Sequence, residues 1–448
     1  MEHKKNTLIH TALKAYRLLH WNEFKYPKPI KGRYDISDNK LEKMKWAYRC
    51  WIRQTEIAEK DSGIEEFLSK QDLRFSTPAD FIKQASLSLS AGGDLMAVDI
   101  ITPENTPHLF DDIRDFYFDA DITCANLEST VYETAPVGRN SAAVSEAARM
   151  NTSEAMLDKF IDGGLGINYF STANNHSFDY GEEGLLATLD VLEKKQCFHS
   201  GINRTPEQQE DVLIIEKNGI KIAFLAYTFD LNGHKCEKKH LVNEVRFNDE
   251  VVDISLIKRH IKKAKEKNAD LIIASCHWGW EFEMYPHKAI IDVAHLLADE
   301  GVDIILGGHP HVGQPMERYE SVQGKDKRQC LIIYSLGNFA TYQPLSRNSK
   351  LTYAVRLQIE KGISTGVSQT YVSELKILPI YIQSGDKGDG TNDFRLVQFE
   401  KLLSNPDKYI LTKEERDDLP RLDKKVLKEI ILPRTWKEHN LIWQEKNR

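Results

Sequence analysis

The sequence predicts an α/β fold, because short apolar runs typical of strands alternate with helical patterns through the middle of the chain. The strand-like runs cover residues 87–91, 122–125, 167–173, 220–227, 271–275, 302–306 and 331–334. Apolar residues recur at helical spacing over 184–195 and 288–300, and Gly301 follows the second pattern, where a helix can end. We therefore expect strands and helices to share one central domain.

Length and composition are those of a soluble globular protein. The chain has 448 residues, of which 41% are hydrophobic and 28% charged, so it can bury a sizeable core. The net charge of −7 provides no general attraction for nucleic acid, and we expect no nucleic-acid partner. The basic run 258–267 alternates with Ile257, Ile261 and Ala264 at helical spacing, which favours the solvated face of a helix over an anion-binding patch.

The cysteines and the N-terminus bear on the compartment. Six cysteines lie far apart without a CxxC pair, so we expect reduced thiols. Lys14 and Arg17 interrupt the first apolar stretch, which therefore resembles neither a signal peptide nor a membrane span. We expect no direct membrane span and a cytoplasmic location for the chain as given.

Changes in pattern divide the chain into three parts. Residues 1–83 form a helical N-terminal extension, with amphipathic patterns at 8–20 and 41–52 separated by prolines. Residues 84–383 form the α/β domain, whose last runs, 352–359 and 367–382, suggest antiparallel strands joined by a glycine-containing turn. Residues 384–448 are predicted to form a loop and a mostly helical tail.

Side chains that can bind metals follow five of the strand-like runs. They are Asp94, Glu128, Asn175, His277, His309 and His311. In open α/β sheets ligands bind beyond the carboxyl ends of the strands, so one topology could bring all of these groups together. Each residue by itself also has an ordinary interpretation, as a turn or cap, a surface carboxylate or a hydrogen-bonded core histidine. Their shared placement favours a metal site.

The chemistry of these groups suits a hydrolytic centre with one or two divalent transition metal ions, with Mn, Fe or Zn as the candidates. Two ions about 3.5 to 4 Å apart can activate water and clamp a phosphoryl oxygen. His309 and His311 are two residues apart, which in an extended segment places both rings on one side. One ring could then face each metal.

The motifs occur in an order that resembles a known family. They are Gly-Asp (93–94), Asn-Leu-Glu (126–128), Asn-Asn-His-Ser-x-Asp-Tyr-Gly (174–181), His-Trp-Gly-x-Glu (277–281), Gly-His-Pro-His-Val (308–312) and Tyr-Ser-Leu-Gly-Asn-Phe (334–339). Over about 86–382 the chain resembles the CapA family of bacterial capsule and poly-γ-glutamate synthesis proteins. The resemblance implies the αββα sandwich of the calcineurin-like metallophosphoesterases, with helical extensions at both ends here.

The resemblance also implies roles for individual residues. Asn175, His277 and His309 resemble ligands of the second metal, whereas Asp94 and His311 resemble ligands of the first. Glu128 stands where a bridging carboxylate is usual. His176 resembles the histidine that stabilises the transition state or protonates the leaving group.

Further residues are candidates for the pocket or for contacts that support the ligands. They are Asn126, Asn174, Trp278, Glu281, Ser335 and Asn338. A plain turn is an equally good interpretation of Ser335 and Asn338, and Glu281 could equally be a surface carboxylate.

One position departs from the superfamily pattern. The first motif of the metallophosphoesterases is Asp-x-His, and here it is Asp94-Leu95-Met96. A thioether is a poor ligand for hard ions, so we expect the first metal to have fewer protein ligands, with Asn126, Asp99 or water as candidates to take the place of the histidine. Met96 is better interpreted as a core residue.

The resemblance implies a metal-dependent hydrolase of phosphoesterase type, or a transferase or amide-cleaving relative, that acts on a capsule-like polymer. The expected substrate is a small or polymeric anion. The alternative is a non-catalytic polymer-binding or scaffold protein with a partly degenerate metal site. Capsule-synthesis subunits are possible partners, with residues 1–83 as a docking segment, and members of the family are often membrane-anchored.

Overall fold

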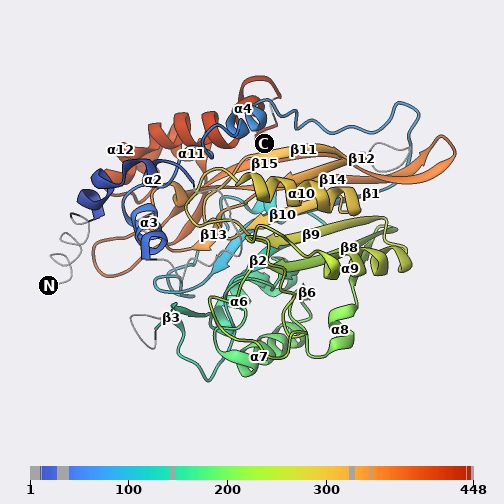
Figure 1. Ribbon diagram of the computed structural model, residues 1–448, viewed down its shortest axis with the longest axis horizontal. Helices are drawn as coiled ribbons and strands as arrows, with labels where there is room; N and C mark the ends of the chain where they lie inside the picture. The colour runs from blue at the N-terminus through green and yellow to red at the C-terminus, as the bar shows by residue number, and fades with distance from the viewer. Residues whose placement is uncertain are drawn as a thin grey trace.

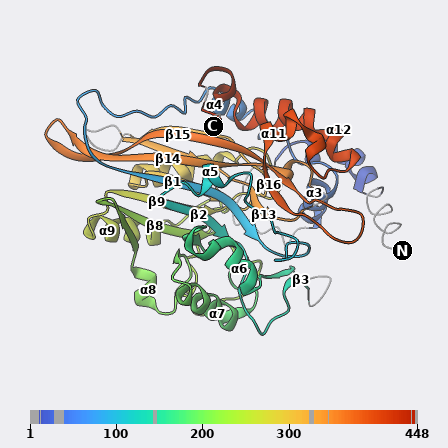
Figure 2. The ribbon, with the colours of Figure 1, turned by 180° about the vertical axis from the view of Figure 1, so that it is seen from behind.

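The computed structural model describes residues 11, 13–27, 40–141, 147–321, 328–343, 346–439 and 441–444. Two β-sheets pack face to face, and helices cover their outer faces. Figure 1 shows α9 (Ser255–Glu266) and α10 (Lys288–Glu300) on one side, and Figure 2 shows α5 (Arg114–Tyr117) and α6 (Glu154–Ile161) on the other. The predicted αββα sandwich is confirmed.

The larger sheet has the strand order β16-β15-β14-β1-β2-β5-β6, and β13 pairs with β1. Its strands are β1 (Ile82–Met96), β2 (Ile122–Leu127), β5 (Tyr169–Ser171), β6 (Phe198–Ser200), β13 (Asn338–Thr341), β14 (Leu351–Ser364), β15 (Val367–Gln383) and β16 (Arg395–Gln398). Strands β1, β2, β5 and β6 run parallel, whereas β14, β15 and β16 are antiparallel. Thr365 and Gly366, with φ of 52° and 79°, form the predicted turn between β14 and β15.

The smaller sheet has the order β11-β12-β10-β9-β8-β7. Its strands are β7 (Leu213–Lys217), β8 (Ile220–Thr228), β9 (Leu271–His277), β10 (Ile304–Gly308), β11 (Met316–Ser321) and β12 (Arg328–Ile333). The four inner strands are parallel, and the two edge strands are antiparallel to their neighbours. A separate two-stranded ribbon consists of β3 (Gly138–Asn140) and β4 (Arg149–Asn151).

The main core fills the space between the sheets. Leu89, Cys124 and Tyr169 of the larger sheet belong to one cluster with Phe224 and Ile273 of the smaller sheet. The rings of Tyr169 and Phe224 are 4.3 Å apart. A second cluster joins the outer face of the larger sheet to its helices, so the strands are covered on both faces and consist of continuous apolar runs.

The helices follow the sequence patterns closely. Residues Ile257, Ile261 and Ala264 of α9 are buried, while Lys258 and Lys262 are exposed, so the basic run is the solvated face of a helix as predicted. Helix α10 ends at Gly301, whose φ is 133°. Further helices are α7 (Gly181–Lys194) and α8 (Pro206–Glu210).

The terminal segments pack onto the sandwich. At the N-terminal side lie α2 (Trp21–Lys25), α3 (Lys40–Trp51) and α4 (Ile64–Ser69), and Figure 1 places α2 and α3 beside α12. At the C-terminal side lie α11 (Phe399–Ser404), α12 (Lys413–Arg421) and the π-helical stretch Leu422–Ile431. Residues 8–10 and 12 of the predicted first helix lie outside the described residues. The domain boundaries stay a prediction.

The start of the expected helical tail is a strand. Residues 395–398 form β16, which extends the larger sheet beside β15. Leu396 and Val397 are fully buried there, and four residues are too few for a pattern to distinguish a strand from the start of a helix. No helix among the described residues is both long and apolar enough to cross a membrane.

Candidate metal centre

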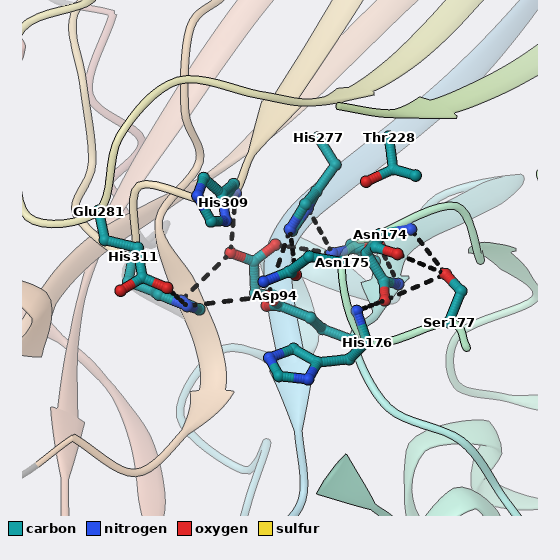
Figure 3. A network of polar contacts seen from close by, with 12 residues as sticks. Asp94, Asn174, Asn175, His176, Ser177, Thr228, His277, Glu281, His309 and His311 are labelled. Carbon is teal, nitrogen blue, oxygen red and sulfur yellow. Dashed lines mark hydrogen bonds and ion pairs between the residues drawn. The ribbon is translucent and has the colours of Figure 1, made fainter. Parts of the chain in front are cut away.

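Strands from both sheets end at one edge of the sandwich, where the predicted ligands meet. Glu128, His277 and His309 form one group, and Asp94, Glu128 and His311 form another. Within each group the candidate ligand atoms lie within 4.8 Å of one another, and every residue is buried. Figure 3 shows Asp94 and the ring of His277 close to the rings of His309 and His311, which lie on one loop. Glu128 belongs to both groups, which is the placement of a bridging carboxylate.

Asp94 lies within β1, next to a register shift between Asp94 and Leu95. Its Oδ1 accepts a hydrogen bond from Nδ2 of Asn126 at 2.9 Å, and its Oδ2 accepts one from the backbone N–H of His309 at 3.3 Å. Nδ1 of His311 is 3.5 Å from the same Oδ2. A Cβ at Gly308 would lie 2.8 Å from Oδ1 of Asp94, so only glycine leaves room for this carboxylate.

Glu128 directly follows β2, and its carboxylate has no hydrogen-bond partner on either oxygen. Oε1 lies 3.3 Å from Nε2 of His277 and 3.7 Å from Nε2 of His311. Burial, with a smaller contribution from the charges of Glu281 and Asp179, raises the pKa of Glu128 to about 8. Burial and the nearby Glu128 raise that of Asp94 to about 7. Two buried carboxylates are costly unless a positive charge compensates them, and a divalent cation supplies that charge.

The histidines present neutral rings to these carboxylates. Burial lowers the pKa of His277 to about 4 and that of His311 to about 3, and it holds the pKa of His309 well below its ordinary value. Neutral imidazole is the form that binds a metal. Nε2 of His277 is 2.9 Å from Oδ1 of Asn175, and Nδ1 of the buried His309 has no hydrogen-bond partner. The donor set therefore fits a divalent transition metal.

The backbone at His309 and His311 corrects one expectation. Both residues have positive φ values, 94° and 55°, so the segment is not extended and the rings do not converge by strand alternation. The ring centroids are 6.2 Å apart. Such backbone conformations cost about 1–3 kcal/mol each and persist only where the surroundings impose them. Here the N–H of Phe282 donates to the carbonyl of Pro310 at 2.9 Å.

His176 lies beside the centre and outside both ligand groups. Its Nδ1 is 2.7 Å from Oδ2 of Asp179, which also accepts a hydrogen bond from the backbone N–H of Met150 at 2.6 Å. Burial by itself would lower the pKa of His176, but Asp179, together with the charges of Glu128 and Glu281, outweighs it and the pKa is raised. The ring therefore holds a proton to higher pH than the other histidines do, as a proton donor must.

Three asparagines make hydrogen bonds around the predicted ligands: Asn126, Asn174 and Asn338. Nδ2 of Asn174 donates to the carbonyl of Leu127 at 2.7 Å, and its Oδ1 accepts from the backbone N–H of His176 at 3.1 Å. Oδ1 of Asn338 is 2.9 Å from Nδ1 of His311, so the other ring nitrogen, Nε2, remains available to the group of candidate ligands. Such contacts orient metal-binding rings. Glu281, 18% exposed at its side chain, approaches Nε2 of His311 at 3.9 Å.

Two of the candidates make structural contacts instead. The indole N–H of the buried Trp278 donates to the carbonyl of Tyr334 at 2.9 Å. Oγ of Ser335 accepts from the backbone N–H of Gly337 at 3.1 Å, which stabilises a turn. These contacts favour the structural interpretation of both residues.

Met96 and Asp99, the two positions considered for the incomplete first motif, have other contacts. Met96 belongs to a small apolar cluster with Val98 and Met150, and Asp99 forms an ion pair of 3.2 Å with Arg139. The contacts of Asp99 therefore do not favour it as a replacement for the missing histidine.

The structure adds two residues that the sequence reasoning missed. Asp179 was part of the quoted motif but received no role. Asn232, four residues beyond the end of β8, accepts a hydrogen bond from Nδ2 of Asn175 at 3.1 Å and lies 3.4 Å from Nδ1 of His176. The available signal was its place after a sixth strand, next to Gly233.

Comparison with known proteins gives a family and several relatives. The family model described as bacterial capsule synthesis protein PGA_cap matches residues 88–343, more than half of the chain. The chain is 24% identical over 314 residues to the capsule biosynthesis protein CapA of Bacillus anthracis, an alignment that covers 69% of this chain and 70% of that protein.

Two further relatives align with smaller parts of this chain. The chain is 28% identical over 267 residues to the PGA biosynthesis protein CapA of Bacillus subtilis, an alignment that covers 58% of this chain and 65% of that protein. It is also 25% identical over 169 residues to a 2',3'-cyclic-nucleotide 2'-phosphodiesterase/3'-nucleotidase of Salmonella typhimurium, an alignment that covers 34% of this chain and 25% of that protein.

Proposed function

The chain belongs to the bacterial capsule synthesis protein family, and from this premise we propose that it is a metal-dependent hydrolase of phosphoesterase type. Its reaction would serve the synthesis or processing of a capsule polymer of the poly-γ-glutamate kind, in keeping with the names of its Bacillus relatives. The observation that carries the proposal is the buried carboxylate of Glu128, which has no hydrogen-bond partner and lies among three neutral histidines.

Six side chains would hold the metal: Asp94, Glu128, Asn175, His277, His309 and His311. Carboxylate, amide and imidazole donors together suit Mn, Fe or Zn. A bound divalent ion would polarise a phosphoryl oxygen and lower the pKa of water. Glu128 would face both positions, because Oε1 approaches both His277 and His311.

The remaining chemistry falls to His176. Its proton, held by the attraction of Asp179, would pass from the ring to the leaving-group oxygen as the phosphoester bond breaks. Asn232 contacts both Asn175 and His176 and would fix the position of the proton donor relative to the metal ligands. The Salmonella relative, a phosphodiesterase and nucleotidase by name, supports phosphoester chemistry for this site.

Arg139 is the side chain we assign to the anionic part of the substrate. Its side chain is 38% exposed. Burial raises the pKa of Glu281 and lowers that of His311, and the charge of Arg139 opposes the first shift and adds to the second, so it acts on the centre from the solvent side. Asp99 holds it at 3.2 Å. A guanidinium can bind a carboxylate or phosphate through two hydrogen bonds, which suits an acidic polymer.

The second candidate function is a non-catalytic polymer-binding or scaffold protein. Met96 favours it, because this buried thioether stands where the superfamily pattern has a ligand histidine and packs among apolar side chains. Retention of the pair His176–Asp179 favours catalysis.

Two measurements separate these functions. Protein purified without chelators is analysed for bound metal by mass spectrometry and then assayed with 4-nitrophenyl phosphate and bis(4-nitrophenyl) phosphate in the presence of Mn²⁺, Fe²⁺ or Zn²⁺. We expect bound metal and hydrolysis of at least one ester, and both should be lost in Glu128→Gln. Bound metal without hydrolysis would favour the scaffold, and no metal uptake at all would refute the metal centre.

A further inference from the structure

Helix α3, which precedes the segment matched by the family model, contacts the metal centre. The indole N–H of Trp46 donates a hydrogen bond to Oε2 of Glu281, a residue 235 positions away in the sequence. The ring of Trp46 also lies 6.2 Å from that of Phe282, which in turn lies 6.1 Å from the ring of His311. A chain of contacts therefore leads from α3 to a predicted ligand.

Residues 281–284 are held by the N-terminal segment on two sides. Nη1 of Arg49 forms an ion pair of 2.7 Å with Oε1 of Glu283, and both side chains are almost fully buried. The N–H of Thr55 donates to the carbonyl of Phe282 at 3.0 Å, and the N–H of Met284 donates to the carbonyl of Thr55 at 2.8 Å. A buried ion pair with added backbone hydrogen bonds allows one geometry, so the position of Glu281 depends on the docking of α3.

The two oxygens of Glu281 face different groups. Oε2 accepts from Trp46, whereas Oε1 is 3.9 Å from Nε2 of His311. The same Nε2 is 3.7 Å from Oε1 of Glu128. Figure 3 shows the Glu281 carboxylate beside the His311 ring. Oε1 of Glu281 therefore adjoins the group of Asp94, Glu128 and His311, which is the group that Met96 leaves short of a ligand.

We propose that Glu281 is an additional ligand of the metal on the His311 side, and that Trp46 is the positioning residue that aims its carboxylate there. The inference rests on the proposed metal centre. A carboxylate oxygen in this place supplies the hard donor that a thioether at position 96 cannot supply. The N-terminal segment is then part of the metal centre.

The test is a calorimetric titration of the chelator-treated full chain with Mn²⁺, which needs no substrate. We expect Trp46→Phe to raise the Kd for Mn²⁺ roughly 10- to 100-fold, the usual effect of losing a group that orients a ligand. Glu281→Gln should raise it at least as much, and Trp46→His, which retains a ring N–H, should restore part of the affinity. Trp436→Phe is the matched control, because its ring packs against Lys428 at 3.9 Å in the C-terminal segment.

Each outcome is decisive. Unchanged Kd values in Trp46→Phe and Glu281→Gln would overturn the inference, and a change in Glu281→Gln only would overturn the role of Trp46. If Trp46→Phe does not fold by circular dichroism, Glu281→Gln decides, because its amide oxygen can still accept from Trp46 and keep α3 docked. A wild-type chain that binds no Mn²⁺ would instead refute the proposed metal centre itself.

Discussion

Replacing His176 with alanine should separate catalysis from metal binding. His176 belongs to neither ligand group, and its Nδ1 is engaged by Asp179 at 2.7 Å, so removing the ring leaves the ligands in place. A positioned general acid contributes roughly 10²- to 10⁴-fold to the rate. At about 1.4 kcal/mol for each factor of ten, the loss corresponds to about 3 to 5 kcal/mol of activation free energy.

The assay is kcat/KM for bis(4-nitrophenyl) phosphate as a function of pH, with metal content measured on the same samples. The exposed His108, which pairs with Asp111, provides the control variant His108→Ala. Asp179→Asn extends the test, because Asp179 raises the pKa of His176. The protonated donor is populated below its pKa, so this variant should shift the alkaline limb of the profile to lower pH.

Two results would refute this reasoning. If His176→Ala loses its metal, His176 is a ligand. If the variant keeps both its metal and its full activity, the proton comes from another group.

The other predictions concern the metal and the buried charges. His309→Ala should lower the metal content measured by mass spectrometry, because its buried ring has an unpaired Nδ1; wild-type content would exclude it as a ligand. Met96→His should modestly raise occupancy of the first metal position, on the His311 side, since no hydrogen-bond partner orients the new ring among Val98 and Met150; an unchanged stoichiometry in calorimetry would count against this. For chelator-treated protein, the free energy of unfolding should fall between about pH 7 and 8, because the unfolded histidines are largely deprotonated there and the raised pKa of His176 acts in the same direction as the two carboxylates. Asp94 and Glu128, with pKa values raised to about 7 and 8, retain protons in the folded state that the unfolded chain has lost. Each retained proton lowers the free energy of unfolding by up to about 1.4 kcal/mol per pH unit. A free energy of unfolding, measured by urea denaturation, that is constant or rises over this pH range would contradict the prediction.

Much of the architecture could be predicted because it depends on local patterns. The run 271–275 became β9, the helical pattern 288–300 became α10 with identical ends, and the basic run became the solvated face of α9. These elements bury their apolar residues with a period that is visible in a short window of sequence. The short strand β16 was missed because four residues carry no such period.

The sequence by itself determined which candidate ligands the site offers, because Asp94, Glu128 and His277 stand at or close to strand ends and the topology brings those ends to one edge. Only the tertiary structure decided how they are oriented. His309 and His311 adopt positive φ values that the sequence pattern did not predict. The contact of Asn232 with His176 and the hydrogen bond from Trp46 to Glu281 join segments that are distant in sequence. Such contacts depend on how separate elements pack, and no local period of the chain encodes them.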